Sequence, residues 1–367
     1  MNKLGFGFLR LPRTDPEDDT TVDFTVLNEM VDTFLASGGT YFDTAYTYLG
    51  GMSETAVRRA LVERYPRSAF TLADKLPSWK VKKKEDCERY FAEQCGRCGV
   101  DYFDIYLLHW LNRENYAIAE QFDEFAFLQK LKIDGKAGRI GFSYHGDADL
   151  LEEILSAHPE VDIVQLQINY LDWESPALEA RRCYETAERF HKEIVVMEPV
   201  KGGTLASLPE EAEVLLRAHA PQASIASWAI RFAQALPQVH IVLSGMNTME
   251  QLLDNIQADM LLSDKERELL DAVCTILRQS IAIPCTACRY CVSHCPEKIA
   301  IPDYFSIYNE YQRNPADGWK ITPVYTAIAG THGKASGCIG CHSCERNCPQ
   351  RIAVSRELSR VAAVFEK

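Results

Sequence analysis

The sequence predicts an α/β fold: a (β/α)8 TIM barrel over residues 1–280, followed by a small, mostly helical unit over residues 281–367. Eight short apolar segments alternate with eight amphipathic segments, and the alternation runs through about 250 residues, the usual length of such a barrel. Cysteine usage places the boundary, because eight of the thirteen cysteines lie after residue 280 in two identical spacings.

The expected strands are short, and several are near-continuous apolar runs, as strands buried on both faces should be. They cover residues 4–12, 40–46, 70–76, 104–110, 139–145, 162–170, 193–200 and 240–246. Segments with helical spacing follow them at residues 22–38, 53–65, 85–99, 125–136, 149–158, 175–192, 224–236 and 248–260, and a ninth at 263–280 leads to the first cysteine motif.

A doubly wound sheet would also alternate strands and helices. It usually has fewer units and begins with a glycine-rich turn, which Gly5-Phe6-Gly7 matches only in part. The number of units therefore favours the barrel.

Composition excludes two classes of partner. The chain has 367 residues and a formal net charge of −13, which argues against a nucleic-acid-binding surface. No stretch approaches the roughly 20 uninterrupted apolar residues that a membrane span needs. The first 19 residues have no long apolar run and no small-residue cleavage site, so we expect no signal peptide and a cytoplasmic location.

Two four-cysteine runs dominate the C-terminal unit, and each ends in Cys-Pro. Their spacing is that of bacterial two-cluster ferredoxins, in which the fourth cysteine of each run binds the other cluster. The sequence therefore predicts two 4Fe-4S clusters. One is expected to be held by Cys285, Cys288, Cys291 and Cys348, and the other by Cys338, Cys341, Cys344 and Cys295.

Zinc is the alternative occupant, because C-x-x-C pairs also bind zinc. Two complete four-cysteine runs that both end in Cys-Pro are poorly explained by zinc sites. The segment between the runs is longer than a minimal ferredoxin needs, and we expect in it an aromatic-rich helix at 302–314 and a loop at 314–337. A shorter pair, Cys95 and Cys98, resembles a redox motif, but its place at the end of an outer helix favours half-buried structural cysteines.

Polar side chains stand at the carboxyl ends of four consecutive expected strands, where barrel active sites are built. They include Asp43, Lys75 and His109, with Tyr48 shortly after the second strand. Each alone could be structural: a buried ion pair, a core histidine or an aromatic at the rim. Their succession along consecutive strands indicates a site.

These residues resemble the catalytic motifs of the aldo-keto reductase family. The likeness includes D-x-A-x-x-Y from Asp43 to Tyr48, and it extends over most of residues 1–260. It implies that Tyr48 is the general acid, that Lys75 lowers the pKa of Tyr48, that Asp43 pairs with Lys75 and that His109 orients a carbonyl. An ammonium beside a phenol favours the phenolate and would bring its pKa nearer to working pH.

The resemblance also implies a bound nicotinamide, NAD(P)(H). Ser143 and Gln165 would hold its carboxamide, and Met197 occupies the position where an aromatic residue commonly stacks on the ring. Phosphates would lie against Lys201, Gly202, Gly203, Gly245, Met246, Asn247 and Asn255. Gln251 aligns where members selective for NADPH place an arginine, so selectivity for NADP is not supported.

The sequence is compatible with three functions. The first is an iron-sulfur oxidoreductase that reduces a carbonyl or oxidises an alcohol, with electrons passed through the clusters and a possible redox partner such as ferredoxin or flavodoxin. The second is a ferredoxin-linked reductase that uses flavin or no organic cofactor, because clusters pass single electrons whereas nicotinamides exchange hydrides. The third is a non-catalytic redox-sensing or scaffold protein.

Overall fold

The computed structural model describes residues 3–15, 18, 20–258, 262–313, 315 and 318–366. The chain forms two compact units. One comprises residues 1–199 and 226–262, and the other comprises residues 200–225 and 263–367. None of the described helices is both long enough and apolar enough to cross a membrane.

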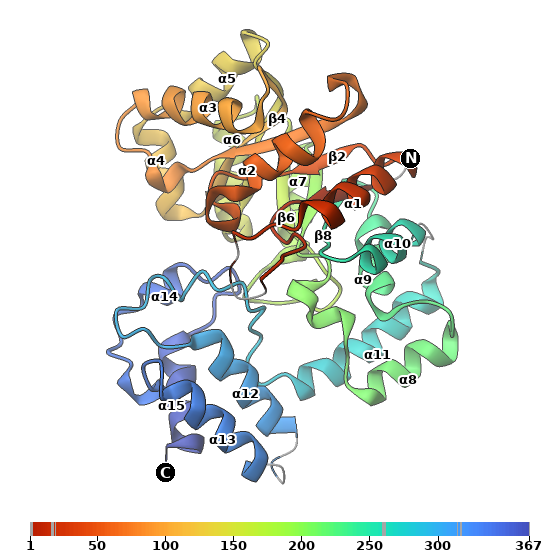
Figure 1. The fold of residues 1–367 in the computed structure, drawn as a ribbon, viewed down its shortest axis with the longest axis vertical. Coiled ribbons are helices and arrows are strands. Elements are labelled where there is room, and N and C mark those ends of the chain that lie inside the picture. Colours follow the sequence, from red (N-terminus) through yellow and green to blue (C-terminus); the bar gives the residue numbers. More distant parts are fainter. Residues whose placement is uncertain are drawn as a thin grey trace. The chain divides into compact units, whose positions relative to one another are not determined.

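The first unit is the predicted barrel. Its eight strands pair in sequence order, all parallel, and β1 closes the barrel against β8 (Figure 1). This closure confirms the barrel over a doubly wound sheet, which stays open. The strands are β1 (Leu4–Gly7), β2 (Tyr41–Asp43), β3 (Thr71–Leu76), β4 (Phe103–Leu111), β5 (Ala137–Tyr144), β6 (Ile163–Gln167), β7 (Glu193–Met197) and β8 (Val239–Gly245).

Helices of the first unit surround these strands, as Figure 1 shows. One of them, α4, was not expected, and the expected helix at 248–260 ends at Gln257 among the described residues; positions 259 and 260 lie outside them. The helices are α1 (Phe24–Ala36), α2 (Met52–Val57), α3 (Glu85–Cys98), α4 (Arg113–Gln121), α5 (Glu124–Ile133), α6 (Ala148–Ala157), α7 (Ala180–Arg189), α9 (Ile225–Gln234) and α10 (Met249–Gln257).

The barrel interior is a group of apolar side chains that β2, β3, β4, β6, β7 and β8 contribute. Its members are Tyr41, Ala73, Ile105, Leu107, Ile163, Val195, Ile241 and Leu243. Gly141 lets β5 approach β6 closely, because a Cβ at this position would meet the carbonyl oxygen of Ile163 at 2.0 Å. This packed layer forms the floor beneath the polar side chains described below.

The second unit is helical and contains both cysteine runs. Helix α12 packs against α13 and α15, and α8 packs against α11. Its helices are α8 (Glu210–His219), α11 (Asp264–Ser280), α12 (Ile301–Arg313), α13 (Gly318–Ala329), α14 (Ser343–Arg346) and α15 (Val354–Phe365).

Several features of this unit differ from expectation, among them helices α8 and α14, which were not predicted. The segment 314–337, expected as a loop, contains the helix α13, with Pro323 inside it; residues 314, 316 and 317 lie outside the described part. Its buried residues Ile321 and Tyr325 contribute to the core of the unit, so tertiary packing outweighs the helix-breaking tendency of proline. The unit also includes residues 200–225, whereas the expected boundary fell at 280 and 281.

The buried carboxyl group of Glu124 makes the barrel sensitive to pH. Its side chain is 0 % exposed and accepts a hydrogen bond of 2.6 Å from Ser78 Oγ, and burial raises its pKa to about 7. The folded state therefore holds this proton more tightly than the unfolded chain does. Stability falls as pH rises through the interval between the unfolded value, about 4.5, and 7.

We predict that Glu124→Gln stabilises the barrel above pH 7 by on the order of 3 kcal/mol, because an amide keeps the Ser78 contact and never ionises. Urea unfolding at pH 8.5 should show the gain, and unfolding at pH 4 should show little. Glu114→Gln, at an exposed helix start, serves as the control. An equal effect of Glu124→Gln at both pH values would contradict the assignment.

Candidate functional site

The period of two along a strand positions the polar side chains of the barrel. Successive side chains point to opposite faces, so a residue two places after an interior residue also faces the interior. This step leads from Tyr41 to Asp43, from Ala73 to Lys75, from Leu107 to His109, from Gly141 to Ser143 and from Ile163 to Gln165. The five polar residues thus form a layer above the apolar floor, at the carboxyl ends of β2 to β6.

Lys75 is the centre of this layer. Its side chain is 0 % exposed, and Nζ lies 2.5 Å from Asp43 Oδ1 and 2.7 Å from the carbonyl oxygen of Thr44. Gln165 Nε2 donates to the other carboxylate oxygen of Asp43 at 3.5 Å. Burial raises the pKa of Asp43 while Lys75 acts in the opposite direction. Because the Lys75 ammonium and the Asp43 carboxylate are both buried, each charge needs the other as its counter-ion.

Tyr48 follows β2 and begins the 3-10 helix η1 (Tyr48–Gly51). The Nζ atom of Lys75 lies 4.9 Å from the centroid of its ring, and the His109 ring lies 5.6 Å away. The expected lowering of the Tyr48 pKa is not found. Burial raises this pKa well above its ordinary value, and the carboxylates of Asp43, Asp74 and Glu198 raise it further. The phenol therefore keeps its proton at neutral pH.

His109 is neutral at the same pH. Its side chain is buried, and burial, Lys75 and His145 all hold its pKa well below the ordinary value. The indole of Trp79 packs on it, with ring centroids 5.1 Å apart. Among the described residues, no group hydrogen-bonds to its Nδ1 atom. A neutral imidazole with an uncommitted nitrogen can bind a polar group of a ligand.

Ser143 and Gln165 form a neighbouring pair on β5 and β6, where they are register partners. The backbone N–H of Trp110 donates to Ser143 Oγ at 2.8 Å, which leaves the hydroxyl hydrogen available as a donor. Gln165 Oε1 is buried and accepts no hydrogen bond from the described residues. One donor and one acceptor side by side match a primary amide such as the carboxamide of nicotinamide.

Some of the residues after β8 that are expected to hold phosphates form hydrogen bonds with neighbouring side chains. Asn247 donates its backbone N–H to Gln251 Oε1 at 2.9 Å, and Asn255 Nδ2 donates to Ser244 Oγ at 2.7 Å. Met246 is fully buried, whereas Gly245 and Asn247 are exposed. Met197, at the end of β7, is partly exposed.

Two residues near these positions were not anticipated. Arg10 lies across Gly245, where an added Cβ would meet its side chain at 3.3 Å. Glu198 influences Tyr48 electrostatically and has a left-handed backbone, with φ of 56°. Arg10 follows the carboxyl end of β1, and Glu198 follows that of β7. Barrel active sites are built at the carboxyl ends of strands, so the same criterion could have identified both residues from the sequence.

Lys201, Gly202 and Gly203 lie in the second unit, on the 3-10 segment η5 (Lys201–Ala206). Lys201 is 1 % exposed, and its Nζ donates to Gln350 Oε1 at 2.7 Å. The structure thus gives this amine a protein partner from the cysteine-rich segment, which the sequence did not suggest.

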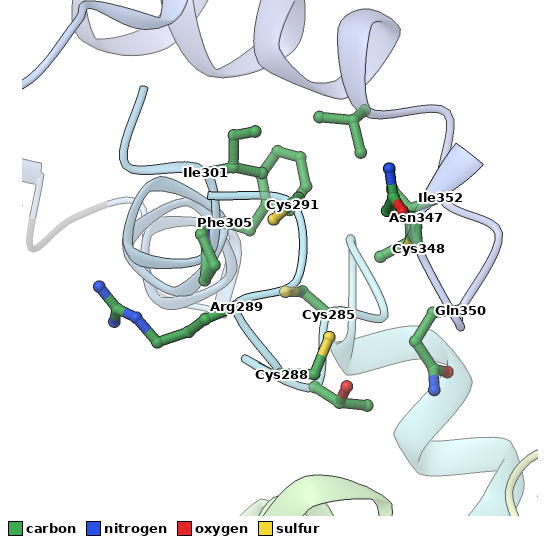
Figure 2. Close-up of a pocket in the computed structure, with 13 residues that line it drawn as sticks. Cys285, Cys288, Arg289, Cys291, Ile301, Phe305, Asn347, Cys348, Gln350 and Ile352 are labelled. Atoms are coloured by element: carbon green, nitrogen blue, oxygen red, sulfur yellow. The ribbon is translucent and has the colours of Figure 1, made fainter. Parts of the chain in front are cut away.

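Each cysteine run contributes three residues to one cavity and one residue to the other. The Cys285 cavity is lined by Cys285, Cys288, Cys291 and Cys348 (Figure 2). The Cys338 cavity is lined by Cys338, Cys341, Cys344 and Cys295. These are the two sets that the ferredoxin spacing predicts, so the structure brings together the residues of each expected cluster.

The two cysteine loops repeat the same backbone conformation. Ala287 and Gly340 are left-handed, with φ of 50° and 66°. Arg289 and His342 form a second such pair, with φ of 62° and 57°. Alternation of this kind turns backbone N–H groups toward one side, which suits anions and cluster sulfur. One such group, the N–H of Ala287, lies 3.5 Å from Cys285 Sγ.

The cavities fit a cluster better than a single ion. Within the described ranges, no three His, Cys, Asp or Glu side chains are close enough together to bind one metal ion. A zinc site needs four ligands around one ion, whereas a cubane spreads its four thiolates over four iron corners. Burial raises the pKa of Cys285 to about 11 and also that of Cys348, and the ammonium of Lys201 acts against both shifts.

Cys95 and Cys98 lie on α3 in the first unit and line neither cavity. Burial raises the pKa of Cys95 to about 12 and raises that of Cys98 well above its ordinary value. A thiol reacts as its thiolate, so both groups are unreactive at neutral pH. This supports a structural role for the pair.

A family model for the aldo/keto reductase family matches residues 3–274. The chain belongs to the aldo/keto reductase family. A second model, for a 4Fe-4S dicluster domain, matches residues 284–353. The predicted fusion is therefore confirmed: the chain combines an aldo/keto reductase family domain with a C-terminal 4Fe-4S dicluster domain.

Curated relatives match only part of the chain. The NADH-specific methylglyoxal reductase of Escherichia coli is 32 % identical over 164 residues, which is 39 % of this chain and 48 % of that protein. Morphine 6-dehydrogenase of Pseudomonas putida is 33 % identical over 95 residues, 26 % of this chain and 31 % of that protein. The matches thus span less than half the length of these relatives.

Solved structures of the family share the barrel. An aldo-keto reductase from Bacillus halodurans in its holo form superposes with a TM-score of 0.60 at 24 % identity, covering 74 % of this chain and 91 % of that one. An aldo/keto reductase from Klebsiella pneumoniae in complex with NADP and acetate gives a TM-score of 0.60 at 20 % identity, with the same coverage. At this level of identity the likeness concerns the fold.

We predict that the iron content of two double variants shows whether the fourth cysteine of each run binds the cluster of the other run. Cys285→Ala combined with Cys348→Ala removes two ligands of one cluster, so about half of the roughly eight irons per chain should remain. Cys338→Ala combined with Cys348→Ala damages both clusters and should remove most iron. Iron and sulfide analysis after anaerobic purification measures this, with Cys274→Ala, a buried cysteine of α11, as the control. The opposite order of iron loss would show that each run binds its own cluster.

Proposed function

We propose that this chain reduces a small carbonyl substrate, or oxidises the corresponding alcohol, at the Tyr48 site, and that two 4Fe-4S clusters pass electrons for this reaction. The observation that supports it best is the layer of Tyr48, Lys75, Asp43 and His109 above the barrel floor. The same chain holds two four-cysteine cavities that fit clusters.

Tyr48 acts as the general acid in this proposal. Its raised pKa keeps the phenol protonated at neutral pH, so it can give its proton to a carbonyl oxygen as that oxygen gains negative charge. The buried Lys75 ammonium lies beneath the ring and stabilises the phenolate that remains. His109 is neutral and orients the carbonyl through a hydrogen bond.

A nicotinamide fits beside these groups. Ser143 would donate to the carboxamide oxygen, and Gln165 Oε1 would accept from the carboxamide nitrogen. Bound there, the cofactor would supply the hydride that reduces the carbonyl carbon. Met197 would contact the ring, and Gly245, Met246, Asn247 and Asn255 would lie along the phosphates, with Arg10 as an additional cation.

The proposed first choice of cofactor is NADH. Gln251 is neutral and accepts from Asn247, so it offers no charge to a 2′-phosphate. The E. coli relative is named as NADH-specific, which agrees with this choice. Lys201, Gly202 and Gly203 stay predictions as phosphate ligands. Nothing in the described residues or in the matched proteins favours a flavin.

The hydride of NADH carries both electrons of a carbonyl reduction, so the clusters would supply electrons only when no NADH takes part. Each 4Fe-4S cluster then gives one electron, and the two electrons together with two protons convert one carbonyl into one alcohol. A one-electron carrier such as ferredoxin or flavodoxin would be a suitable partner. The complete set of Tyr48, Lys75, Asp43 and His109 argues against a scaffold that has lost its activity.

We predict that Tyr48→Phe lowers carbonyl reduction by a factor of about 100 to 10 000, because the proton donor is lost while the ring and its packing remain. The assay is NADH oxidation with methylglyoxal, the substrate in the name of the E. coli relative, under anaerobic conditions. Tyr41→Phe, which removes a buried phenol oxygen from the barrel floor, is the matched control. Unchanged turnover in Tyr48→Phe would refute the site.

A further inference from the structure

Lys201 is a buried cation beside the Cys285 cavity. It is 1 % exposed, and its Nζ donates to Oε1 of Gln350, which lines that cavity and is 5 % exposed. Its charge also acts on the thiols of Cys285 and Cys348, where it lowers the pKa of each against the effect of burial. The same charge would stabilise an anionic cluster in this cavity.

The backbone holds Lys201 in this place. The next residue, Gly202, has a left-handed φ of 64°, and a Cβ there would meet the carbonyl oxygen of Thr286 at 2.5 Å. Thr286 also lines the Cys285 cavity. The loop that carries Lys201 is therefore packed directly on the first cysteine loop, within one compact unit.

The position equivalent to Gln350 in the other cavity carries a carboxylate instead of a neutral amide. Gln350 is the residue after Cys348-Pro349, and its counterpart after Cys295-Pro296 is Glu297. Glu297 lines the Cys338 cavity and is exposed. Other exposed residues also line this cavity, among them Cys341 and Ile339, the latter 63 % exposed. The Cys285 cavity thus has the buried cation of Lys201 beside it and the exposed cation of Arg289 in its lining, whereas the lining of the Cys338 cavity includes the carboxylate of Glu297.

We propose that Lys201 holds the reduction potential of the cluster in the Cys285 cavity above that of the cluster in the Cys338 cavity. A nearby positive charge favours the reduced, more negative cluster, and a nearby carboxylate disfavours it. An electron that enters at the exposed Cys338 cluster then moves to the Cys285 cluster. The first cluster is oxidised by one electron and the second is reduced by one, with no bond or proton transferred. This inference rests on the proposed pair of clusters.

The test is a redox titration of the anaerobic holoprotein, followed by electron paramagnetic resonance. Lys201→Met should lower the potential of the Cys285 cluster enough to change the equilibrium for electron exchange at least tenfold, or about 59 mV. Lys201→Arg should retain the wild-type value. Glu297→Gln, an exposed change, should raise the potential of the Cys338 cluster. Each signal is assigned by titrating Cys338→Ala, in which the Cys285 cluster remains.

Lys265→Met, an exposed lysine on α11 of the same unit, should shift neither potential. The proposal is overturned if Lys201→Met leaves both potentials unchanged, and also if it weakens NADH binding while the potentials stay constant. In the latter case Lys201 serves the phosphates. If Lys201→Met fails to assemble, Lys201→Gln is titrated in its place, and unchanged potentials in that variant overturn the proposal. Absence of iron from the wild-type protein would instead refute the proposed clusters.

Discussion

The exchange of the fourth cysteine between the two runs is the constraint on which the second unit depends. Cys348 completes the cavity of the first run, and Cys295 completes the cavity of the second. Neither cavity can close until chain segments about 50 residues apart have met, so binding of the clusters and folding of this unit are expected to be one event. Helices α12 and α15 both contribute to the lining of the two cavities and pack against each other.

In the barrel, the corresponding constraint is the burial of Lys75. A fully buried ammonium requires Asp43, and Asp43 in turn is held by Gln165 from β6. The pair fixes the layer in which Tyr48 and His109 lie. Burial then determines their protonation: it keeps the phenol protonated and the imidazole neutral, which is the combination that a carbonyl reduction needs.

Much of this arrangement could be predicted from the sequence because it depends on short-range patterns. The cysteine spacing is local, and the strand period of two needs only the strand positions. The pKa of Tyr48 was predicted in the wrong direction, since a motif identifies Lys75 as a neighbour but does not show how completely the surroundings are buried. Helix α13 was missed because its stability comes from packing of Tyr325 in the core. The contact of Lys201 with Gln350 joins residues 149 positions apart, which no local pattern reports.

The central claim is that the clusters and the Tyr48 site serve one reaction. The most direct measurement starts from anaerobic protein with both clusters chemically reduced, mixed with the carbonyl substrate in the presence and absence of NAD. The visible absorbance of the clusters and the alcohol formed are followed together. We predict that the clusters are reoxidised, with one alcohol formed for every two electrons lost, and that Tyr48→Phe abolishes both changes. Clusters that stay reduced while NADH-dependent reduction proceeds at its full rate would contradict it.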